Sequence, residues 1–200
     1  RLEAARDPEH HDDMRDAGVR ELQQRFDVDL VQARRVQDLA LGLMRRLDGA
    51  PRDAAARLAR RELAWAAALH EVGMLVSHHD HHRHSAYLLS HADAAGFSQS
   101  QQRRLADLVL AQRGGLRKVE AALAEPGFAQ ATLSLRLAVL LSHARADADL
   151  EGLRLRRDGD TVTLTVPARW QRAHPRSAFL LHEELADWAK VGALRVVLAD

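Results

Sequence analysis

The sequence predicts a mainly α-helical protein with a small α+β module at its C-terminal end. Two observations lead to this fold class. Up to about residue 148, apolar residues recur at the spacing of amphipathic helices. From about residue 150 they alternate with polar residues, which is typical of half-buried strands. We therefore expect a helical domain over residues 13–148 and an α+β module over residues 151–200, with residues 1–12 as a severed polar connection to a longer protein.

The first half of the helical domain is predicted to contain three helices. Residues 13–26 carry apolar residues near helical spacing, and Asp29 is a good N-cap for a second helix that runs to Leu47. Residues 54–72 form an Ala-rich segment that is apolar around much of its circumference. We expect this third helix to be buried and to end at Gly73, because glycine often ends helices.

The second half of the domain is predicted to contain three more helices. A short one spans residues 83–91, after a histidine-rich connection. Ser98 and Gln101 have the spacing of a capping box, so a further helix should begin there and end near Gly114. The very apolar segment over residues 131–144 is predicted to be the central helix of a bundle.

The C-terminal module is predicted to have the order β-β-α-β. Leucines alternate with arginines from Leu153, a turn follows over residues 157–160, and apolar residues then alternate with threonine over residues 161–166. This pattern predicts a hairpin. One helix should cover residues 179–188, before an apolar strand over residues 194–198. Three strands need a helix layer or a partner to bury their apolar face.

Charge limits the classes of partner. The formal net charge is only +1, which gives no overall field to attract a polyanion, so no nucleic-acid partner is expected and any anion site must be local. Lys118 and Lys190 are the only lysines among the 29 basic residues. The others are arginines, whose planar fork binds phosphate through paired hydrogen bonds. The alternative explanation is a GC-rich genome that favours arginine and alanine codons.

The lack of cysteine and of a long apolar segment bears on the cellular compartment of the protein. There is no cysteine, which excludes disulfides and thiolate sites and fits a reducing cytoplasm. No apolar run approaches the roughly 18 residues that span a bilayer. We expect a cytoplasmic protein without a membrane span.

Two short motifs carry most of the chemical information. Residues 69–73 read Leu-His-Glu-Val-Gly, and residues 82–87 read His-Arg-His-Ser-Ala-Tyr. Both motifs, and the distance between them, resemble the C-terminal region of the Ppx/GppA phosphatases. The His70-Glu71 pair is also similar to the His-Asp pair of the HD superfamily of phosphohydrolases, which implies an HD-like helical bundle. Weaker likeness to the Ppx/GppA family covers most of the chain, as in residues 32–36, 96–99, 135–141 and the terminal β-β-α-β order.

The resemblance implies a parent exopolyphosphatase that releases terminal orthophosphate from inorganic polyphosphate. In this family the catalytic carboxylate and Mg²⁺ belong to two actin-like domains, and no Gly-rich phosphate loop of that kind occurs here before residue 150. This chain is therefore expected to hold polyphosphate, to help form a homodimer and to be inactive alone. Two alternatives stay open: the same region of a guanosine pentaphosphate phosphohydrolase, and a stand-alone regulatory or protein-interaction domain.

Four residues are predicted to bind substrate, and none in this chain is predicted to be catalytic. They are His70, His82, Arg83 and His84. Backbone amides at a helix start favour anions, and Arg83 can add a two-pronged contact to phosphate. The structural alternatives are a His70 that is hydrogen-bonded within the core and an Arg83 that caps the following helix.

No metal site is expected in this region. A working HD site needs an upstream histidine, but residues 27–61 contain none. It also needs a later aspartate, where this chain has Val139 or Leu140, and Glu71 replaces the aspartate of the pair. The alternative is adventitious metal capture by the histidine-rich segment, which contains His78, His79, His81, His82, His84 and His91.

Overall fold

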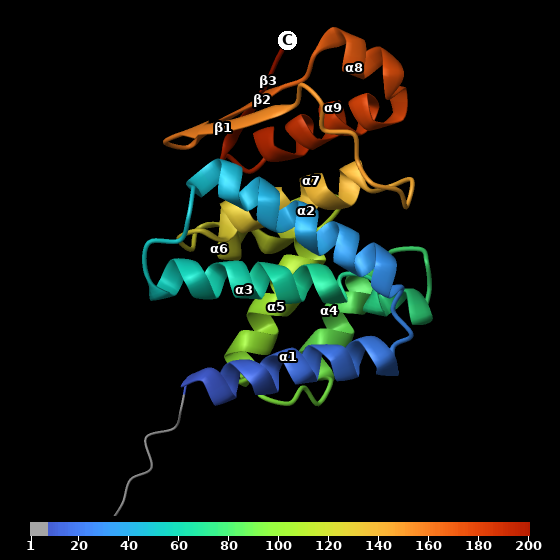
Figure 1. Ribbon diagram of the computed structural model, residues 1–200, viewed down its shortest axis with the longest axis vertical. Helices are drawn as coiled ribbons and strands as arrows, with labels where there is room; N and C mark the ends of the chain where they lie inside the picture. Colours follow the sequence, from blue (N-terminus) through green and yellow to red (C-terminus); the bar gives the residue numbers. More distant parts are fainter. Residues whose placement is uncertain (1–7) are drawn as a thin grey trace, which may run out of the picture.

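The computed structural model describes residues 8–200 and confirms a mainly helical bundle followed by a small α+β module (Figure 1). Helix α1 (Pro8–Arg25) begins five residues before the predicted start at residue 13. The predicted polar connection over residues 1–12 is therefore wrong for residues 8–12, while residues 1–7 lie outside the described part. Proline is favoured in the first turn of a helix, so Pro8 is a suitable first residue.

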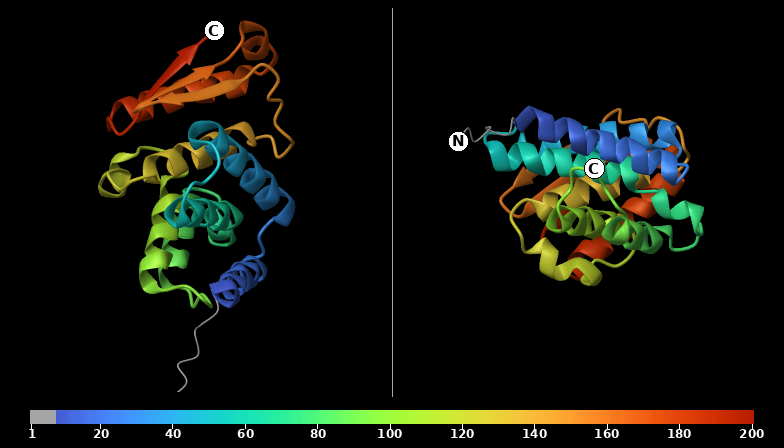
Figure 2. Two further views of the ribbon diagram at one scale, coloured as in Figure 1. Left: turned by 60° about the vertical axis from the view of Figure 1, so that its left-hand side comes forward. Right: turned by 90° about the horizontal axis from the view of Figure 1, so that it is seen from below.

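Seven further helical segments build the bundle around α7 (Phe128–Leu141), which is almost entirely buried. In Figure 1, α2 and α7 lie next to the sheet, α3 lies below them, and α1 lies at the end opposite the sheet. Helices α4 and α5 run behind α3, toward α7 (Figure 2). The segments are α2 (Leu30–Asp48), α3 (Ala54–Leu69), α4 (His81–His91), α5 (Gln99–Ala111), α6 (Glu120–Leu123) and the 3₁₀ turns η1 (Val72–Leu75) and η2 (Arg117–Val119).

The predicted helix starts that depend on local capping are confirmed. The Asp29 carboxylate accepts a hydrogen bond from the Gln32 backbone N–H at 3.0 Å at the start of α2. Ser98 and Gln101 form both hydrogen bonds of the capping box at the start of α5. A side-chain cap satisfies backbone donors that have no partner inside the helix, so these starts are determined by a few adjacent residues.

Several predicted helix bounds are wrong because tertiary packing determines them. Helix α3 ends at Leu69, and Gly73 lies inside η1 rather than closing α3. A Cβ atom at Gly73 would collide with the His81 carbonyl oxygen and the Ser85 backbone nitrogen. The glycine therefore permits α4 to approach η1 closely, which is a long-range requirement.

Other helices are shifted along the chain from their predicted positions. Helix α4 begins at His81, two residues before the predicted start. Helix α5 ends at Ala111, before Gly114, and α7 both begins and ends three residues earlier than predicted. The earlier start adds His82 to the helix, so that His82, Arg83 and His84 all lie in the first turn of α4.

The C-terminal module contains the predicted hairpin, formed by β1 (Arg154–Asp158) and β2 (Thr161–Thr165). Strand β3 (Arg195–Ala199) lies parallel to β2, which gives the sheet order β1-β2-β3. The predicted β-β-α-β order needs one correction, since two helices, α8 (Ala168–Ala173) and α9 (Pro175–Ala189), connect β2 to β3. Helix α8 is only six residues long, so its sequence has little helical periodicity.

The module and the bundle share one apolar core. Helix α9 packs against α7 and β3, and the C-terminal part of α2 packs against β1. Leucines from all these layers meet in the seam between them, namely Leu43, Leu137, Leu141, Leu153, Leu155, Leu164 and Leu181. The apolar sheet face is therefore covered by helices of this chain. In the described part of the chain, none of the helices has the length and apolar character that a membrane span requires.

A buried arginine ties the two parts together. Arg136 of α7 is 2% exposed and donates from Nε to the Glu184 carboxylate at 2.6 Å and from Nη2 to Asp187 at 3.1 Å, both on α9. Its Nη1 donates to the carbonyl oxygens of Ala111 and Gly114, each at 2.8 Å. A buried charge is tolerated only when it is paired and hydrogen-bonded, so these four acceptors fix α9 and the segment after α5 relative to α7.

We predict that Arg136→Met lowers the free energy of unfolding by about 3–5 kcal/mol, because Glu184 would remain buried without its partner. Urea denaturation measures the loss. The matched control is Arg34→Met, which removes an exposed pair with Asp38 and should change stability by less than about 1 kcal/mol. Equal effects of the two substitutions would contradict the role given to Arg136.

Candidate functional site

A large polar cleft lies where the bundle meets the C-terminal module. It has a volume of about 1230 Å³. One wall is the start of α4 and the segment that follows α5, and the opposite wall is α9. The floor includes residues of α7, among them Arg136. The charged residues that line the cleft are eight basic ones, Arg83, Arg113, Arg117, Lys118, Arg136, Arg145, Arg176 and Lys190, and five acidic ones, Glu71, Asp80, Glu183, Glu184 and Asp187.

The acidic residues are largely occupied by ion pairs, which leaves the cleft with excess positive charge. Glu184 and Asp187 accept hydrogen bonds from Arg136. Glu71 is paired with Arg145 at 2.9 Å. Six of the eight basic residues lie outside these pairs, and four of the six, Arg83, Arg113, Arg117 and Lys118, belong to α4 and the segment after α5.

The N-terminus of α4 opens onto this wall without a side-chain cap. Asp80, which precedes the helix, has a left-handed backbone (φ 52°), and its carboxylate makes no capping hydrogen bond. The first backbone N–H groups of a helix have no acceptor inside the helix and carry partial positive charge. An uncapped helix start in a basic cleft is a suitable place for an anion.

The first two residues of α4, His81 and His82, are both buried. His81 is 5% and His82 is 4% exposed, and the Nδ1 atom of each has no hydrogen-bond partner among the described residues. Burial, followed by nearby positive charges, lowers the pKa of each histidine to about 4. Both rings are therefore neutral near pH 7. As neutral rings they add polar atoms but no charge to the lining of the cleft.

The segment after α5 supplies cations to the same wall. Its backbone turns at Gly114, which has φ 74°, and the Lys118 ammonium donates to the Arg113 carbonyl oxygen at 2.6 Å. Burial, followed by the charges of Arg136, Arg83 and Arg113, lowers the pKa of Lys118 to about 8. The mutual repulsion of these cations favours the binding of an anion between them.

His70 lies at the deep end of the cleft and is held by backbone contacts. Its Nδ1 lies 2.6 Å from the Ala67 carbonyl oxygen, and because a carbonyl only accepts, Nδ1 carries the proton. The His70 carbonyl oxygen accepts hydrogen bonds from Gln112 Nε2 at 2.8 Å and from the Ser85 hydroxyl at 3.2 Å. Burial lowers the pKa of His70, which keeps its ring neutral.

Arg145 also lines the cleft, where it forms ion pairs with Glu71 and Asp29. Its Nη1 and Nη2 donate to the two carboxylate oxygens of Glu71 at 2.9 and 3.0 Å, and Nη2 also donates to Asp29 at 2.9 Å. The hydrogen bond from Arg145 lowers the pKa of Asp29. Arg145 has a left-handed backbone with φ 55°, a conformation that costs energy for a residue other than glycine. The guanidinium supplies the positive charge that the nearly buried Glu71 requires.

The structure brings together three of the four residues predicted to bind substrate. His70, His82 and Arg83 line the cleft, whereas His84 is half-buried on the helix and does not line it. Sequence reasoning did not identify the basic segment Arg113–Lys118 or the α9 wall as parts of the site. One feature of the sequence could have drawn attention to these segments, because the chain has only two lysines. Both of them, Lys118 and Lys190, line this cleft.

We predict that stability falls as the pH is lowered from about 6.5 toward 4. An unfolded histidine titrates near 6.5, whereas His81 and His82 titrate at about 4 when folded, so the unfolded state binds more protons in this window. The contribution is complete above pH 6.5 and is lost as pH falls. Between pH 7.5 and 5 the two histidines should lower the free energy of unfolding by roughly 2–4 kcal/mol in total.

The check is urea denaturation at several pH values for the double variant His81→Gln, His82→Gln, which should have a flatter profile than the unmodified protein. The control is His78→Gln, His79→Gln, because these histidines are exposed. A profile that flattens equally in both variants would show that burial of His81 and His82 is not the cause.

Comparison with known families identifies the chain. The profile described as Ppx/GppA phosphatase, domain III, matches residues 14–187, which covers most of the bundle and of the C-terminal module. The match includes both walls of the cleft and agrees with the resemblance seen in residues 69–73 and 82–87. The chain belongs to the Ppx/GppA phosphatase family, in which it represents the C-terminal region.

Proposed function

We propose that this chain is the substrate-handling region of an exopolyphosphatase and that its cleft holds inorganic polyphosphate. The observation that carries the proposal is the gathering of Arg83, Arg113 and Lys118 around the uncapped start of α4. Polyphosphate carries negative charge along its whole length, and both guanidinium groups and helix N-termini bind phosphate oxygens. The size of the cleft, about 1230 Å³, suits several phosphate units rather than one.

Two features of the cleft favour polyphosphate over guanosine pentaphosphate as the ligand. No Phe, Tyr or Trp side chain is among the described residues that line it. A guanine base is usually bound against such a plane, as bases are in many nucleotide sites. The basic residues of the cleft instead match a ligand made of repeated phosphates.

The family also suggests which part of the parent enzyme carries out hydrolysis. We propose that hydrolysis takes place in the actin-like domains of the parent enzyme, with Mg²⁺, and that this region alone releases no orthophosphate. The parent is proposed to be cytoplasmic and to form a homodimer. Exposed apolar side chains at the two helix ends that Arg145 bridges offer a surface for such contacts; they are Leu30, Val31, Leu75 and Val76.

We predict that this chain binds long-chain polyphosphate and that the affinity falls as the salt concentration rises. The reason is that basic side chains that bind the polymer displace its counterions. The double variant Arg83→Ala, Arg113→Ala should bind roughly tenfold more weakly or worse, since two charge-assisted contacts are lost. Isothermal titration calorimetry at low and moderate salt measures both effects.

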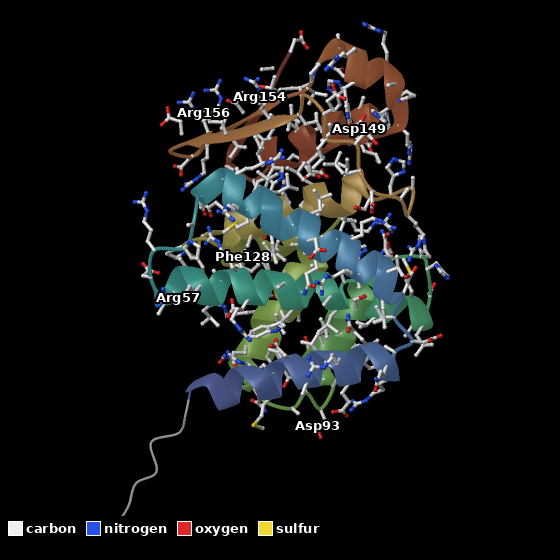
Figure 3. The ribbon with its side chains drawn as sticks, viewed as in Figure 1. Arg57, Asp93, Phe128, Asp149, Arg154 and Arg156 are labelled. Carbon is white, nitrogen blue, oxygen red and sulfur yellow. The ribbon has the colours of Figure 1, made fainter. Side chains whose placement is uncertain are left out.

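The matched control is Arg154→Ala, Arg156→Ala. These two arginines are exposed on β1 and point away from the helical bundle (Figure 3). Both double variants lose the same charge, so a general electrostatic effect would weaken both equally. Equal weakening, or binding that is indifferent to salt, would refute the cleft as the polyphosphate site.

A further inference from the structure

Lys118 is held in an unusual position at the edge of the cleft. Its side chain lies back over the Gly114 turn, so that a Cβ atom added at Gly114 would be 3.3 Å from Nζ. The hydrogen bond from Nζ to the Arg113 carbonyl oxygen, at 2.6 Å, fixes the amino group there. The amino group is half-buried and lines the cleft.

The surroundings of Lys118 favour the neutral amine. The charged groups that face it are Arg83 of α4, Arg113, Arg136 of α7 and Asp187 of α9. Asp187 opposes the three arginines, but it is already paired with Arg136. Burial is the largest cause that lowers the pKa of Lys118 to about 8, and the arginines add to it. A lysine that is desolvated beside other cations is an activated nucleophile.

Lys190 provides a contrast within the same cleft. Its Nζ lies 3.4 Å from an Asp187 carboxylate oxygen, and its side chain is 61% exposed. The ion pair holds the Lys190 amino group at the Asp187 carboxylate. The chain thus contains two lysines, one with a cationic and half-buried environment and one with an anionic and exposed environment.

We propose that Lys118 is a site of acylation by small acyl phosphates, which enter the cleft through their phosphate group. The phosphate would be held by Arg83, Arg113 and the backbone N–H groups at the start of α4, as proposed above for polyphosphate. This places the acyl carbon beside Lys118, whose Nζ is on the same wall. The inference rests on the anion-binding character of the cleft but not on the identity of its natural polymer.

The chemical step needs no further reactant. The lone pair of the Lys118 amine attacks the acyl carbon and forms a C–N bond. The C–O bond to the phosphate breaks, and the phosphate leaves with the electron pair. The proton lost by the nitrogen passes to the leaving phosphate or to water. The products are an amide at Lys118 and free inorganic phosphate.

Acylation would change the ligand affinity of the cleft. The amide carries no charge, so the cationic cluster of Arg83, Arg113 and Lys118 would lose one of its members. Polyphosphate should then bind more weakly. The level of acyl phosphate would thereby regulate how well this region holds its substrate.

The test is incubation of the protein with acetyl phosphate at pH 8, followed by mass spectrometry of peptides that contain Lys118 or Lys190. We expect Lys118 to be acetylated at least tenfold faster than Lys190, because its surroundings lower the pKa of Lys118 to about 8 and so raise its fraction of neutral amine. Inorganic phosphate should slow the reaction at Lys118. A Lys190 rate equal to or above that of Lys118 would overturn the proposal.

A second reagent separates guidance by the phosphate from simple reactivity. p-Nitrophenyl acetate transfers the same acetyl group but carries no phosphate, so the preference for Lys118 should be several-fold smaller with it. The double variant Arg83→Gln, Arg113→Gln should lose the extra preference with acetyl phosphate. Equal preference with both reagents in the unmodified protein would contradict capture of the phosphate.

Polyphosphate binding, measured before and after acetylation, completes the design. Acetylation should weaken binding by the unmodified protein roughly tenfold, and the same treatment of Lys118→Arg should leave the affinity of that variant unchanged. Binding of polyphosphate without preferential acetylation of Lys118 refutes this inference alone. Preferential acetylation without polyphosphate binding refutes the proposed function and leaves this inference standing.

Discussion

The guanidinium of Arg136 is the constraint on which the rest of the architecture depends. A charge that is 2% exposed must be neutralised where it lies, and this requirement recruits Glu184 and Asp187 from α9 and two carbonyl oxygens from the segment after α5. Those acceptors belong to the two opposite walls of the cleft. Glu184 also accepts a hydrogen bond at 2.7 Å from the indole N–H of Trp188, which is fully buried in the core. Arg136 therefore holds α9 and the segment after α5, which both line the cleft, to α7.

This arrangement explains how a nearly neutral protein presents a cationic site. Three of the five carboxylates that line the cleft are paired with arginine. Arg136 binds Glu184 and Asp187, and Arg145 binds Glu71. Four of the six remaining basic residues, Arg83, Arg113, Arg117 and Lys118, lie on the wall formed by α4 and the segment after α5. The nearby histidines are neutral because they are buried, so they add ring nitrogens without adding charge. The result is local positive charge with polar groups behind it, which suits a flexible polyanion.

The elements that the sequence predicts well are those determined by neighbouring residues. Asp29 and Ser98 cap the helices that follow them, and the alternation in residues 161–166 produces a strand, because these signals act within one turn or one strand. Gly73 was misread as a helix end because its role, close approach of α4, involves residues that are distant in the chain. The family motif led to His82 and Arg83, and the structure places both in the cleft. Arg113 and Lys118 could not be placed beside them, since contacts between distant residues, such as the hydrogen bond from Arg136 to the Gly114 carbonyl oxygen, bring that segment to the same wall.

The most direct test of the polyphosphate cleft is an amide nuclear magnetic resonance titration of this 22.3 kDa chain with polyphosphate. Direct binding to backbone N–H groups and to the adjacent loop changes the resonances of those amides first. The account predicts the largest shifts at residues 81–84 and 113–118, with small shifts on the outer face of the sheet around Arg154 and Arg156. Shifts confined to the sheet, with unchanged amides at the start of α4, would contradict it.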